Sequence, residues 1–468
     1  MMLRLSEAAP PLSAHLHSRD VAFTGVSTDT RTLKPGNLFV ALRGGHYDGH
    51  RFIAAAASAG AAAALVDAAG AHEVPPDLPA LIVEDTRLAL GRLGAYWRSR
   101  FAIPLVGLTG SSGKTTVKEM LAAVLREAAV DAAGLDDAAG DATGDAVLAT
   151  RGNLNNDIGM PLMLLELSPG HRHAVIEMGM NHSGEIRYLT QLAQPDVALV
   201  TNAGRAHIEY LGSEESIARA KGEIFEGLRP EGTAVINADD RFAPLWRELT
   251  SGKRCIEFGL EQPAAVTGSY RLHELESEII LKTPAGQAPA RVRAPGVHNV
   301  RNALAATAAA VALDIPVGVI AKGLTRYAGI KGRLQRKSGI NGAGLIDDTY
   351  NANPESVRAA IDVLAQAPAA KVLVFGDMGE LGADAPRLHT EIGAYAKAAG
   401  IDRMMTLGAE SARASRAFGD GARHYSAIED LLKDARSAAQ PGVTMLVKGS
   451  RFMHMERVIE ALHVPNAK

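Results

Sequence analysis

The sequence predicts an α/β protein of three domains: a small α/β N-terminal domain, a central parallel-sheet domain of the P-loop type, and a C-terminal Rossmann-like, doubly wound domain. The first observation is length, since 468 residues correspond to about three domains of roughly 150 residues each. The second is the succession of a strand, a glycine-rich loop and a helix near residue 110. The third is a strand–helix alternation after residue 332, which is typical of a parallel, doubly wound sheet. We expect domains at 1–102, 103–331 and 332–468.

The N-terminal region contains short apolar runs separated by turns. We expect three strands there, at Val21–Arg31, Leu38–Leu42 and Leu81–Val83. The alanine-rich segment Ile53–Ala64 predicts a helix that ends near Gly60 or later, because alanine has the highest helix propensity.

The central region begins with the apolar run Ile103–Leu108, which predicts a buried strand. The loop that follows leads into a helix whose apolar positions recur at helical spacing: Val117, Met120, Leu121, Val124 and Leu125. Three more buried strands are expected at Ala174–Ile176, Val197–Val200 and Ala234–Ile236. An antiparallel section is expected at 255–293, and a long helix at Asn299–Leu313. Asp131–Asp145 consists largely of Asp, Ala and Gly, and we interpret it as a flexible surface loop with no assigned function.

The C-terminal region repeats one unit. A short strand, Leu345–Ile346, leads into two aspartates and then into a helix after Pro354. Further strands, each followed by a helical stretch, are expected at Lys371–Phe375, Arg403–Leu407 and Thr444–Val447.

Composition excludes several classes of protein. The net charge of −3 provides no basic excess for binding nucleic acid or an anionic membrane. The single cysteine, Cys255, allows no internal disulfide, which suits a reducing compartment. No signal peptide is recognisable, and no stretch offers the ~20 apolar residues that a membrane span needs. We expect a soluble, cytoplasmic protein without membrane insertion, and a monomer.

The strongest local signal lies between the first central strand and its helix. It comprises Gly110, Ser111, Ser112, Gly113, Lys114, Thr115 and Thr116. Glycines let backbone N–H groups close around phosphate oxygens, and the helix adds the positive end of its dipole. Lys114 can bridge the terminal phosphates and the Thr115 hydroxyl can bind Mg²⁺. The general P-loop pattern requires a glycine where Leu108 stands, so a glycine-rich turn that caps the helix is the alternative.

Polar residues follow two further strands of the predicted central sheet. Glu177 ends one apolar run, and Asn202 and His207 follow the next. Ligands bind at the carboxyl ends of strands in such sheets, so these residues are candidate Mg²⁺ ligands. Taken singly, each could be a helix cap or a loop residue, and Lys221 would ordinarily be a solvated helix lysine. The chain lacks the Asn-Lys-x-Asp motif with which GTPases read guanine.

Taken together, Gly110–Thr116, Glu177, His207 and Lys221 resemble the ATP-dependent Mur ligases. The resemblance implies that Lys114, Glu177, His207 and Lys221 carry the catalysis. It also implies a Mg²⁺ site, with Mn²⁺ as a substitute, formed by Thr115, Glu177, His207 and Lys221. In this family the lysine is usually carbamylated, which supplies an anion where an ammonium would repel the metal.

Longer motifs resemble the member of this family that adds D-alanyl-D-alanine. They are Gly152–Gly159, Glu177–Glu185, Asp347–Pro354 and Phe375–Gly382, with departures at Met180 and Ser183. The residues Ser27, Thr28, Asp29, Arg31, Asp48 and His50 resemble a UDP-sugar-binding domain. The resemblance therefore implies two small-molecule substrates, UDP-MurNAc-tripeptide and D-Ala-D-Ala, which the enzyme joins in peptidoglycan synthesis.

The resemblance also implies how the chain binds them. ATP phosphorylates the tripeptide carboxylate, and the dipeptide amine then attacks the acyl phosphate. Asn299 is expected near adenine, and Arg333 and Asp348 near the phosphates and ribose. The remaining substrate contacts are expected from Asn155, Asn156, Tyr350, Asn351, Asn353, Lys448 and Arg451. Because these residues come from different domains, closure about hinges near 100–103 and 329–333 is expected.

Two alternatives stay open. One is a sister ligase that adds diaminopimelate or lysine, or a folylpolyglutamate synthetase. The other is a P-loop switch or binding module that makes no product. The sequence does not decide whether the acceptor tripeptide ends in diaminopimelate or lysine.

Overall fold

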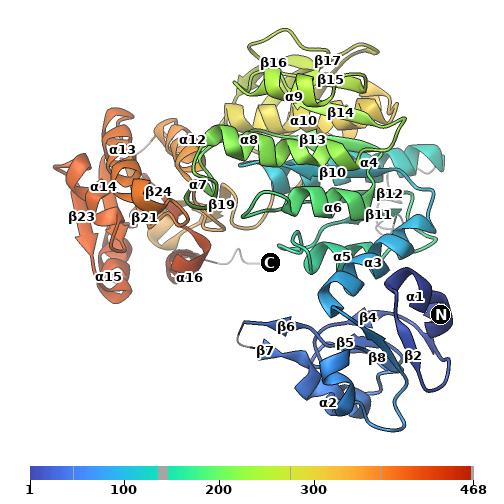
Figure 1. Ribbon diagram of the computed structural model, residues 1–468. Helices are drawn as coiled ribbons and strands as arrows, with labels where there is room; N and C mark the ends of the chain where they lie inside the picture. The colour runs from blue at the N-terminus through green and yellow to red at the C-terminus, as the bar shows by residue number, and fades with distance from the viewer. Residues whose placement is uncertain (46, 135–145, 275, 369, 465–468) are drawn as a thin grey trace.

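The computed structural model describes residues 1–464, except residues 46, 135–145, 275 and 369. Its three main sheets lie in three bodies: the N-terminal sheet at the bottom of Figure 1, the central sheet above it, and the C-terminal sheet to the left. This arrangement confirms the predicted three-domain α/β architecture. The domain boundaries stay predictions, since α3 (Thr86–Ser99) packs both on the N-terminal sheet and against helices of the central domain.

The N-terminal domain is built on a five-stranded sheet in the order β2-β9-β8-β5-β4. Its strands are β2 (His15–His17), β9 (Ala80–Val83), β8 (Ala63–Asp67), β5 (Leu38–Val40) and β4 (Val26–Ser27), of which only β2 is antiparallel. Helices α1 (Leu5–Leu12) and α3 cover one face, and α2 (Ile53–Ser58) covers the other. Two short antiparallel pairs accompany this sheet: β1 (Leu3–Arg4) with β3 (Ala22–Phe23), and the hairpin of β6 (Arg43–Gly44) and β7 (Tyr47–Asp48).

Two N-terminal predictions are wrong in extent. Val21–Arg31 is not one strand but contains the separate strands β3 and β4, and beyond them Asp29 accepts the backbone N–H of Arg31 in a local turn. The helix predicted at Ile53–Ala64 ends at Ser58, and Gly60 adopts a φ of 91°, which favours glycine. Ala63 and Ala64 instead begin β8, because pairing with β5 and β9 on both sides outweighs the helix propensity of alanine.

The central domain contains a six-stranded, fully parallel sheet in the order β11-β12-β10-β13-β14-β15. Its strands are β11 (Val147–Ala149), β12 (His173–Glu177), β10 (Leu105–Thr109), β13 (Val197–Val200), β14 (Thr233–Asn237) and β15 (Arg254–Phe258). The antiparallel section is confirmed as a separate sheet of β16 (Thr267–Leu272), β17 (Ser277–Thr283) and β18 (Gly286–Val292). The start of the predicted section, however, is β15, which belongs to the parallel sheet.

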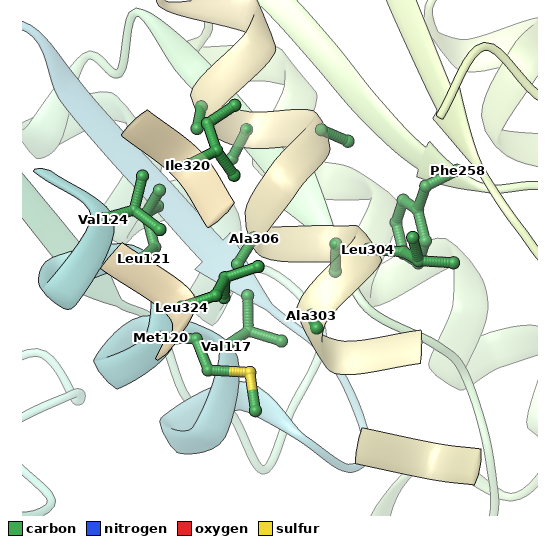
Figure 2. Packing of buried hydrophobic residues seen from close by; sticks show 14 of the residues in the cluster. Val117, Met120, Leu121, Val124, Phe258, Ala303, Leu304, Ala306, Ile320 and Leu324 are labelled. Atoms are coloured by element: carbon green, nitrogen blue, oxygen red, sulfur yellow. The ribbon is translucent and has the colours of Figure 1, made fainter. Parts of the chain in front are cut away.

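Two helices, α4 (Lys114–Ala132) and α10 (Val297–Ala312), cover one face of the central sheet, and α11 (Val317–Arg326) packs on α4 and on β18. Figure 2 shows the apolar residues of α4, such as Met120 and Leu121, beside Ala306 of α10 and Leu324 of α11. The fit is tight, since a Cβ on Gly323 would lie 2.4 Å from the Val124 Cα. The other face is covered by α5 (Gly159–Leu164), α6 (Glu185–Ala193), α8 (Glu214–Gly222) and α9 (Ala243–Leu249). This packing fixes α4, and with it the glycine-rich loop at its N-terminus.

The C-terminal sheet has the order β19-β20-β24-β21-β22-β23. Its strands are β19 (Gln335–Ser338), β20 (Gly344–Asp348), β24 (Val443–Lys448), β21 (Ala370–Gly376), β22 (Arg403–Leu407) and β23 (Ala422–Tyr425), all parallel except β19. Helices α12 (Pro354–Ala365), α13 (Ala385–Ala398) and α14 (Ser411–Phe418) pack on one face, and α15 (Ile428–Ala438) and α16 (Glu456–Leu462) on the other. Helices on both faces confirm the predicted doubly wound domain.

The predicted loop Asp131–Asp145 is shorter than expected at its start, because α4 continues to Ala132. Residues 135–145 lie outside the described residues. No helix in the described part of the chain is long and apolar enough to cross a membrane.

Candidate active site

A cleft of about 1820 Å³ lies where the three domains meet. Its central wall is the carboxyl edge of the parallel sheet, at the loops that follow β10, β12 and β13. The C-terminal domain adds residues such as Asp348 and Tyr350, and the start of α3 adds Asp85 and Arg87. The cleft is therefore placed where ligands of open α/β sheets bind.

Two glycines shape the loop Gly110–Thr116. Gly110 has a φ of 157°, and a Cβ there would lie 1.8 Å from Thr201 Oγ1. Gly113 has a φ of 82°, and a Cβ there would lie 2.3 Å from Asn302 Oδ1. Both positions need glycine, Gly110 for the close approach and Gly113 also for its left-handed backbone. The loop leads directly into α4, so its N–H groups and the helix dipole form an anion-binding site at the N-terminus of that helix.

Asn202 holds this loop in place. Its Oδ1 accepts the Ser112 N–H at 2.9 Å, and its Nδ2 donates to the Ser112 carbonyl at 3.0 Å. Thr201 Oγ1 donates to the same carbonyl at 2.7 Å. Asn202, one of the candidate metal ligands, is thus engaged through both side-chain atoms in supporting the loop.

Lys114 and Thr115 face the cleft. Lys114 Nζ donates to the Gly110 carbonyl at 2.7 Å, which curls the side chain over the loop. Desolvation lowers the pKa of the Lys114 amine, and nearby Glu177 opposes that shift. Thr115 Oγ1 accepts a hydrogen bond of 2.9 Å from Arg333 Nη2, which comes from the segment that enters the C-terminal domain.

Glu177 is 2% exposed at the end of β12. Asn155 Nδ2 donates to its Oε1 at 2.8 Å, and Thr150 Oγ1 accepts its backbone N–H at 2.9 Å. Its Oε2 is buried without a hydrogen-bond partner among the described residues. An unpartnered carboxylate oxygen beside a phosphate-binding loop suits a hard divalent cation.

His207 follows β13 in a left-handed backbone conformation, with a φ of 66°. Its Nδ1 lies 2.7 Å from Oε2 of Glu380, a residue of the C-terminal domain. Burial lowers the pKa of the imidazole, and the contact with Glu380 partly opposes this shift. A neutral ring is the form in which histidine binds metals.

Lys221 lies near the end of α8 and is only 1% exposed. Its amine makes no hydrogen bond or ion pair with any described residue. Burial, and secondarily the charge of Lys114, lowers its pKa well below the usual 10.5. The burial excludes the alternative of a solvated helix lysine, and the lowered pKa favours the neutral form of the amine.

The four predicted metal ligands are the Thr115 hydroxyl, the Glu177 carboxylate, the His207 imidazole and the Lys221 amine. Within the described residues, no three His, Cys, Asp or Glu side chains form a group that could hold a metal ion by themselves. Glu177 and His207 leave the set incomplete, and a charged Lys221 would repel a cation. The residues fit Mg²⁺ only when Lys221 supplies an anion and the nucleotide supplies phosphate oxygens.

The C-terminal residues form two linked contacts in the cleft. The Arg333 guanidinium lies 4.4 Å from the centre of the Tyr350 ring, a cation–π distance. Lys448 Nζ contacts Asp348 Oδ2 at 2.5 Å and donates to the Asn351 carbonyl at 2.9 Å. Arg451 also lines the cleft and contacts Glu456 at 3.2 Å.

Asn299 lies at the other end of the cleft, in the first turn of α10. Its Nδ2 donates to the Pro295 carbonyl at 2.8 Å, and its Oδ1 accepts from Asn302 at 3.1 Å. Beside it, burial lowers the pKa of His298 to about 4. Asn156 caps the turn before α5 by accepting the Gly159 N–H at 2.8 Å.

The predicted N-terminal substrate residues do not line this cleft; they are Ser27, Thr28, Asp29, Arg31, Asp48 and His50. Asp29 and Arg31 pair at 2.6 Å on the surface. His50 is 2% exposed, with its Nδ1 at 2.7 Å from Asp48 and its Nε2 accepting the Asp67 N–H. His50 therefore supports the β6–β7 hairpin. Contact of these residues with a substrate stays a prediction.

Sequence reasoning missed two kinds of residue. Arg205 and Glu380 join the central and C-terminal domains; Glu380 lies in the motif Phe375–Gly382, but its contact with the central domain was not predicted. Tyr47 on the β6–β7 hairpin and Phe52 in the short helix that follows it stack at 5.3 Å while 49% and 38% exposed. The signal that could have identified Tyr47 and Phe52 was the presence of two aromatic residues close in sequence to Asp48, a predicted substrate residue.

Family models match the chain in three consecutive segments. Residues 22–98 match the catalytic domain of the Mur ligase family, residues 108–310 the Mur ligase middle domain, and residues 332–451 the Mur ligase glutamate ligase domain.

Individual relatives match over the full length. A UDP-N-acetylmuramoyl-tripeptide--D-alanyl-D-alanine ligase of Escherichia coli (strain K12) is 41% identical over 462 residues, 98% of each chain. A crystal structure of MurF from Acinetobacter baumannii has a TM-score of 0.87 at 36% identity, covering 97% of each chain. MurF ligase from Thermotoga maritima in complex with ADP has a TM-score of 0.80 at 26% identity, covering 93% of this chain and 96% of that one. The chain belongs to the Mur ligase family.

Proposed function

We propose that this chain is an ATP-dependent, ADP-forming ligase that joins D-Ala-D-Ala to UDP-MurNAc-tripeptide. The product is the UDP-MurNAc-pentapeptide of peptidoglycan synthesis. The observation that carries the proposal is the full-length match to a relative whose name states both substrates. The cleft supports it, because one phosphate-binding loop faces polar side chains from two other domains, as a reaction of three substrates requires.

In the first step, a carboxylate oxygen of the tripeptide attacks the γ-phosphorus of ATP. The bond from that phosphorus to the β–γ bridging oxygen breaks, and ADP leaves. Negative charge spreads over the transferring group, and Lys114 and the loop N–H groups neutralise it. Arg333 adds a second cation to the same place, since its guanidinium already reaches the Thr115 hydroxyl.

In the second step, the amine of D-Ala-D-Ala attacks the carbonyl carbon of the acyl phosphate. The carbon–oxygen bond to phosphate breaks, phosphate leaves, and the amine loses a proton as the peptide bond forms. Holding amine and acyl phosphate together makes this step effectively intramolecular. Tyr350, Asn351 and Asn353 line the cleft at the C-terminal domain and are proposed to place the dipeptide or the nucleotide.

We propose that Thr115, Glu177, His207 and a carbamylated Lys221 hold Mg²⁺. Three observations support this set: the Oε2 of Glu177, buried without a partner among the described residues, the lowered pKa of His207, and the buried side chain of Lys221 with its lowered pKa. A neutral amine is the form that reacts with CO₂ to give a carbamate. The metal would supply charge neutralisation at the phosphates, and Mn²⁺ suits the same donors.

The remaining assignments follow the same proposal. Asn299 would meet adenine, Asp348 the ribose, and Asn155 and Asn156 the muropeptide. The six N-terminal residues, from Ser27 to His50, would bind the UDP-muropeptide in a domain spanning residues 1–102. The ATP domain would span 103–331 and the C-terminal domain 332–468, with hinges near 100–103 and 329–333. We place the enzyme in the cytoplasm, acting as a monomer.

Phosphate release tests the function directly. The purified chain is given ATP, Mg²⁺ and UDP-MurNAc-tripeptide, with and without D-Ala-D-Ala, and products are weighed by mass spectrometry. We expect release that depends on the dipeptide, together with a UDP-pentapeptide. Release driven by a free amino acid, with D-Ala-D-Ala inert, would assign the chain to a sister ligase. Hydrolysis without any coupled product would instead favour a P-loop switch.

A further inference from the structure

Arg205 belongs to the loop that carries His207, but it does not line the cleft. Its Nε donates to Glu355 Oε1 at 3.0 Å, and its Nη1 lies 3.6 Å from Glu391 Oε2. Glu355 is in the first turn of α12 and Glu391 is in α13. One guanidinium of the central domain is therefore held between two carboxylates of the C-terminal domain.

The two carboxylates depend on Arg205 to different degrees. Glu391 is also contacted by Arg358 at 3.3 Å and by Arg387 at 2.5 Å. Glu355 has no other side-chain partner among the described residues, and its Oε2 is buried and unpaired. The Arg205 side chain itself is only 24% exposed. Losing Arg205 would leave the Glu355 carboxylate without its counter-charge; that side chain is 37% exposed, but its Oε2 is buried.

The same contact surface reaches the nucleotide loop and the proposed metal site. Asn353, the N-cap of α12, donates from Nδ2 to Ser112 Oγ at 3.1 Å. Glu380 Oε2 lies 2.7 Å from His207 Nδ1, and its carbonyl accepts the Glu209 N–H at 3.4 Å. The C-terminal domain thus touches the loop 201–209 on both sides of His207.

We infer that Arg205 is a positioning residue whose pair with Glu355 latches the C-terminal domain over the nucleotide site. The inference depends on the proposed function in one respect: ATP is taken as the ligand that needs the closed state. A latch raises the fraction of molecules in the closed state. The apparent affinity for a ligand that needs this state rises by the same factor. Because saturating substrates close the domains themselves, kcat should depend on the latch less than ligand affinity does.

The test compares full-length wild type with Arg205→Ala. Binding of Mg²⁺ with a non-hydrolysable ATP analogue is measured by calorimetry, and the radius of gyration of the free protein by small-angle scattering. We expect about tenfold weaker binding, a larger radius, and a kcat changed by less than about threefold at saturation. Arg247→Ala is the matched control, since Arg247 pairs with Glu257 at 2.6 Å on the surface of the same domain. It should match wild type in each measurement.

A double-mutant cycle with Glu355→Gln isolates the pair. If the two residues act as a unit, Arg205→Ala combined with Glu355→Gln binds the analogue no more weakly than the worse single variant. Thermal unfolding of each variant verifies that the fold is intact. Scattering and binding by Arg205→Ala that equal those of the control would overturn the latch, and so would additive losses in the cycle. Failure of wild type to bind the analogue would contradict the proposed function, while the scattering comparison would still decide the latch.

Discussion

Asn155 donates a hydrogen bond of 2.8 Å from Nδ2 to Oε1 of Glu177, and the second oxygen of that carboxylate is buried without a partner in the described part of the chain. One oxygen is thus oriented by a neighbour and the other is free for a ligand. This is how side chains behind a metal site hold the residues that bind the metal. Asn155, expected beside the muropeptide, therefore has a second candidate task, which is to aim Glu177.

Replacing Asn155 by alanine should weaken metal binding. Glu177 would lose the bond that fixes its plane, and partners of this kind are worth about 10–100-fold in metal affinity or activity. We expect the Mg²⁺ concentration at half-maximal rate to rise by about that factor, with a smaller change in KM for the muropeptide. Initial rates over a Mg²⁺ titration measure both quantities.

Asn181→Ala is the control for that experiment. Asn181 lines the same cleft, but its side chain makes no hydrogen bond with the described residues. If Asn155 instead binds the muropeptide directly, its variant will raise KM for the muropeptide and leave the Mg²⁺ dependence unchanged.

Lys221→Met should stabilise the protein in CO₂-free buffer. The folded state favours the neutral amine, because burial lowers its pKa well below 10.5. The unfolded chain binds its proton more tightly than the folded chain does, so wild-type stability rises with pH between the lowered folded pKa and the unfolded pKa of about 10.4. The gain in stability from the apolar variant should therefore be largest at neutral pH and should shrink toward about pH 10. Urea unfolding at several pH values measures it.

Lys118→Met is the matched contrast. Lys118 is as buried as Lys221, at 1% exposed, but its amine donates to the Thr150 carbonyl at 2.5 Å and pairs with Glu119 at 2.7 Å. Its loss removes a satisfied charge and should destabilise the protein. A Lys221→Met variant that behaves the same way would show that Lys221 is charged and paired in the folded protein.

Carbamylation of Lys221 has its own test. Incubation with ¹³C-bicarbonate should give a carbamate signal by NMR that is absent from Lys221→Ala. The activity of Lys221→Ala should be low and should recover in part when a small carboxylate such as formate is added, since that anion can occupy the same space. A wild-type spectrum without the signal, from protein that is active, would contradict the proposed carbamate.

Much of the fold was predictable, because it depends on local pattern. Buried parallel strands such as Val197–Val200 are continuous apolar runs, and the helix after the phosphate loop has apolar residues at helical spacing. The prediction was wrong where pairing with distant strands determines the secondary structure. Ala63 and Ala64 carry no strand signal of their own, and only the neighbouring strands β5 and β9 make them part of the sheet.

The site was predictable only in part. The phosphate loop is contiguous, so its residues could be found by spacing. Lys221 lies on a largely polar helix, and its burial depends on packing that the sequence does not display. Arg205 and Glu355 are 150 positions apart, and nothing local to either residue signals the pair.

Lys448→Met should destabilise the C-terminal domain strongly. Lys448 contacts Asp348 at 2.5 Å, and the two side chains are only 3% and 12% exposed. Removing one partner of a buried pair costs about 3–5 kcal/mol, because the remaining charge is desolvated and unpaired. The double variant Lys448→Met with Asp348→Asn removes both charges and should recover a large part of that loss. Urea unfolding of the four proteins gives the coupling energy, and simple additivity would contradict a mutually dependent pair.

Arg333 and Tyr350 give the last prediction. The guanidinium lies 4.4 Å from the ring centre and donates to Thr115 Oγ1 at 2.9 Å, so the ring supports an arginine that is aimed at the phosphate loop. Arg333→Ala should lower kcat by about 100–1000-fold, the usual cost of one group that stabilises transition-state charge. Lysine should not restore the rate, because it lacks the planar fork that stacks and donates together.

Variants of Tyr350 distinguish its support of Arg333 from direct contact with a substrate. Tyr350→Phe keeps the aromatic face and should retain most of the wild-type kcat. Tyr350→Leu removes the cation–π contact, worth about 0.5–2 kcal/mol, and should lower kcat roughly 2–30-fold. Steady-state kinetics with ATP and dipeptide varied in turn distinguishes the two tasks. If phenylalanine is as harmful as leucine and the loss appears in KM for the dipeptide, the hydroxyl binds substrate and the ring does not act by steadying Arg333.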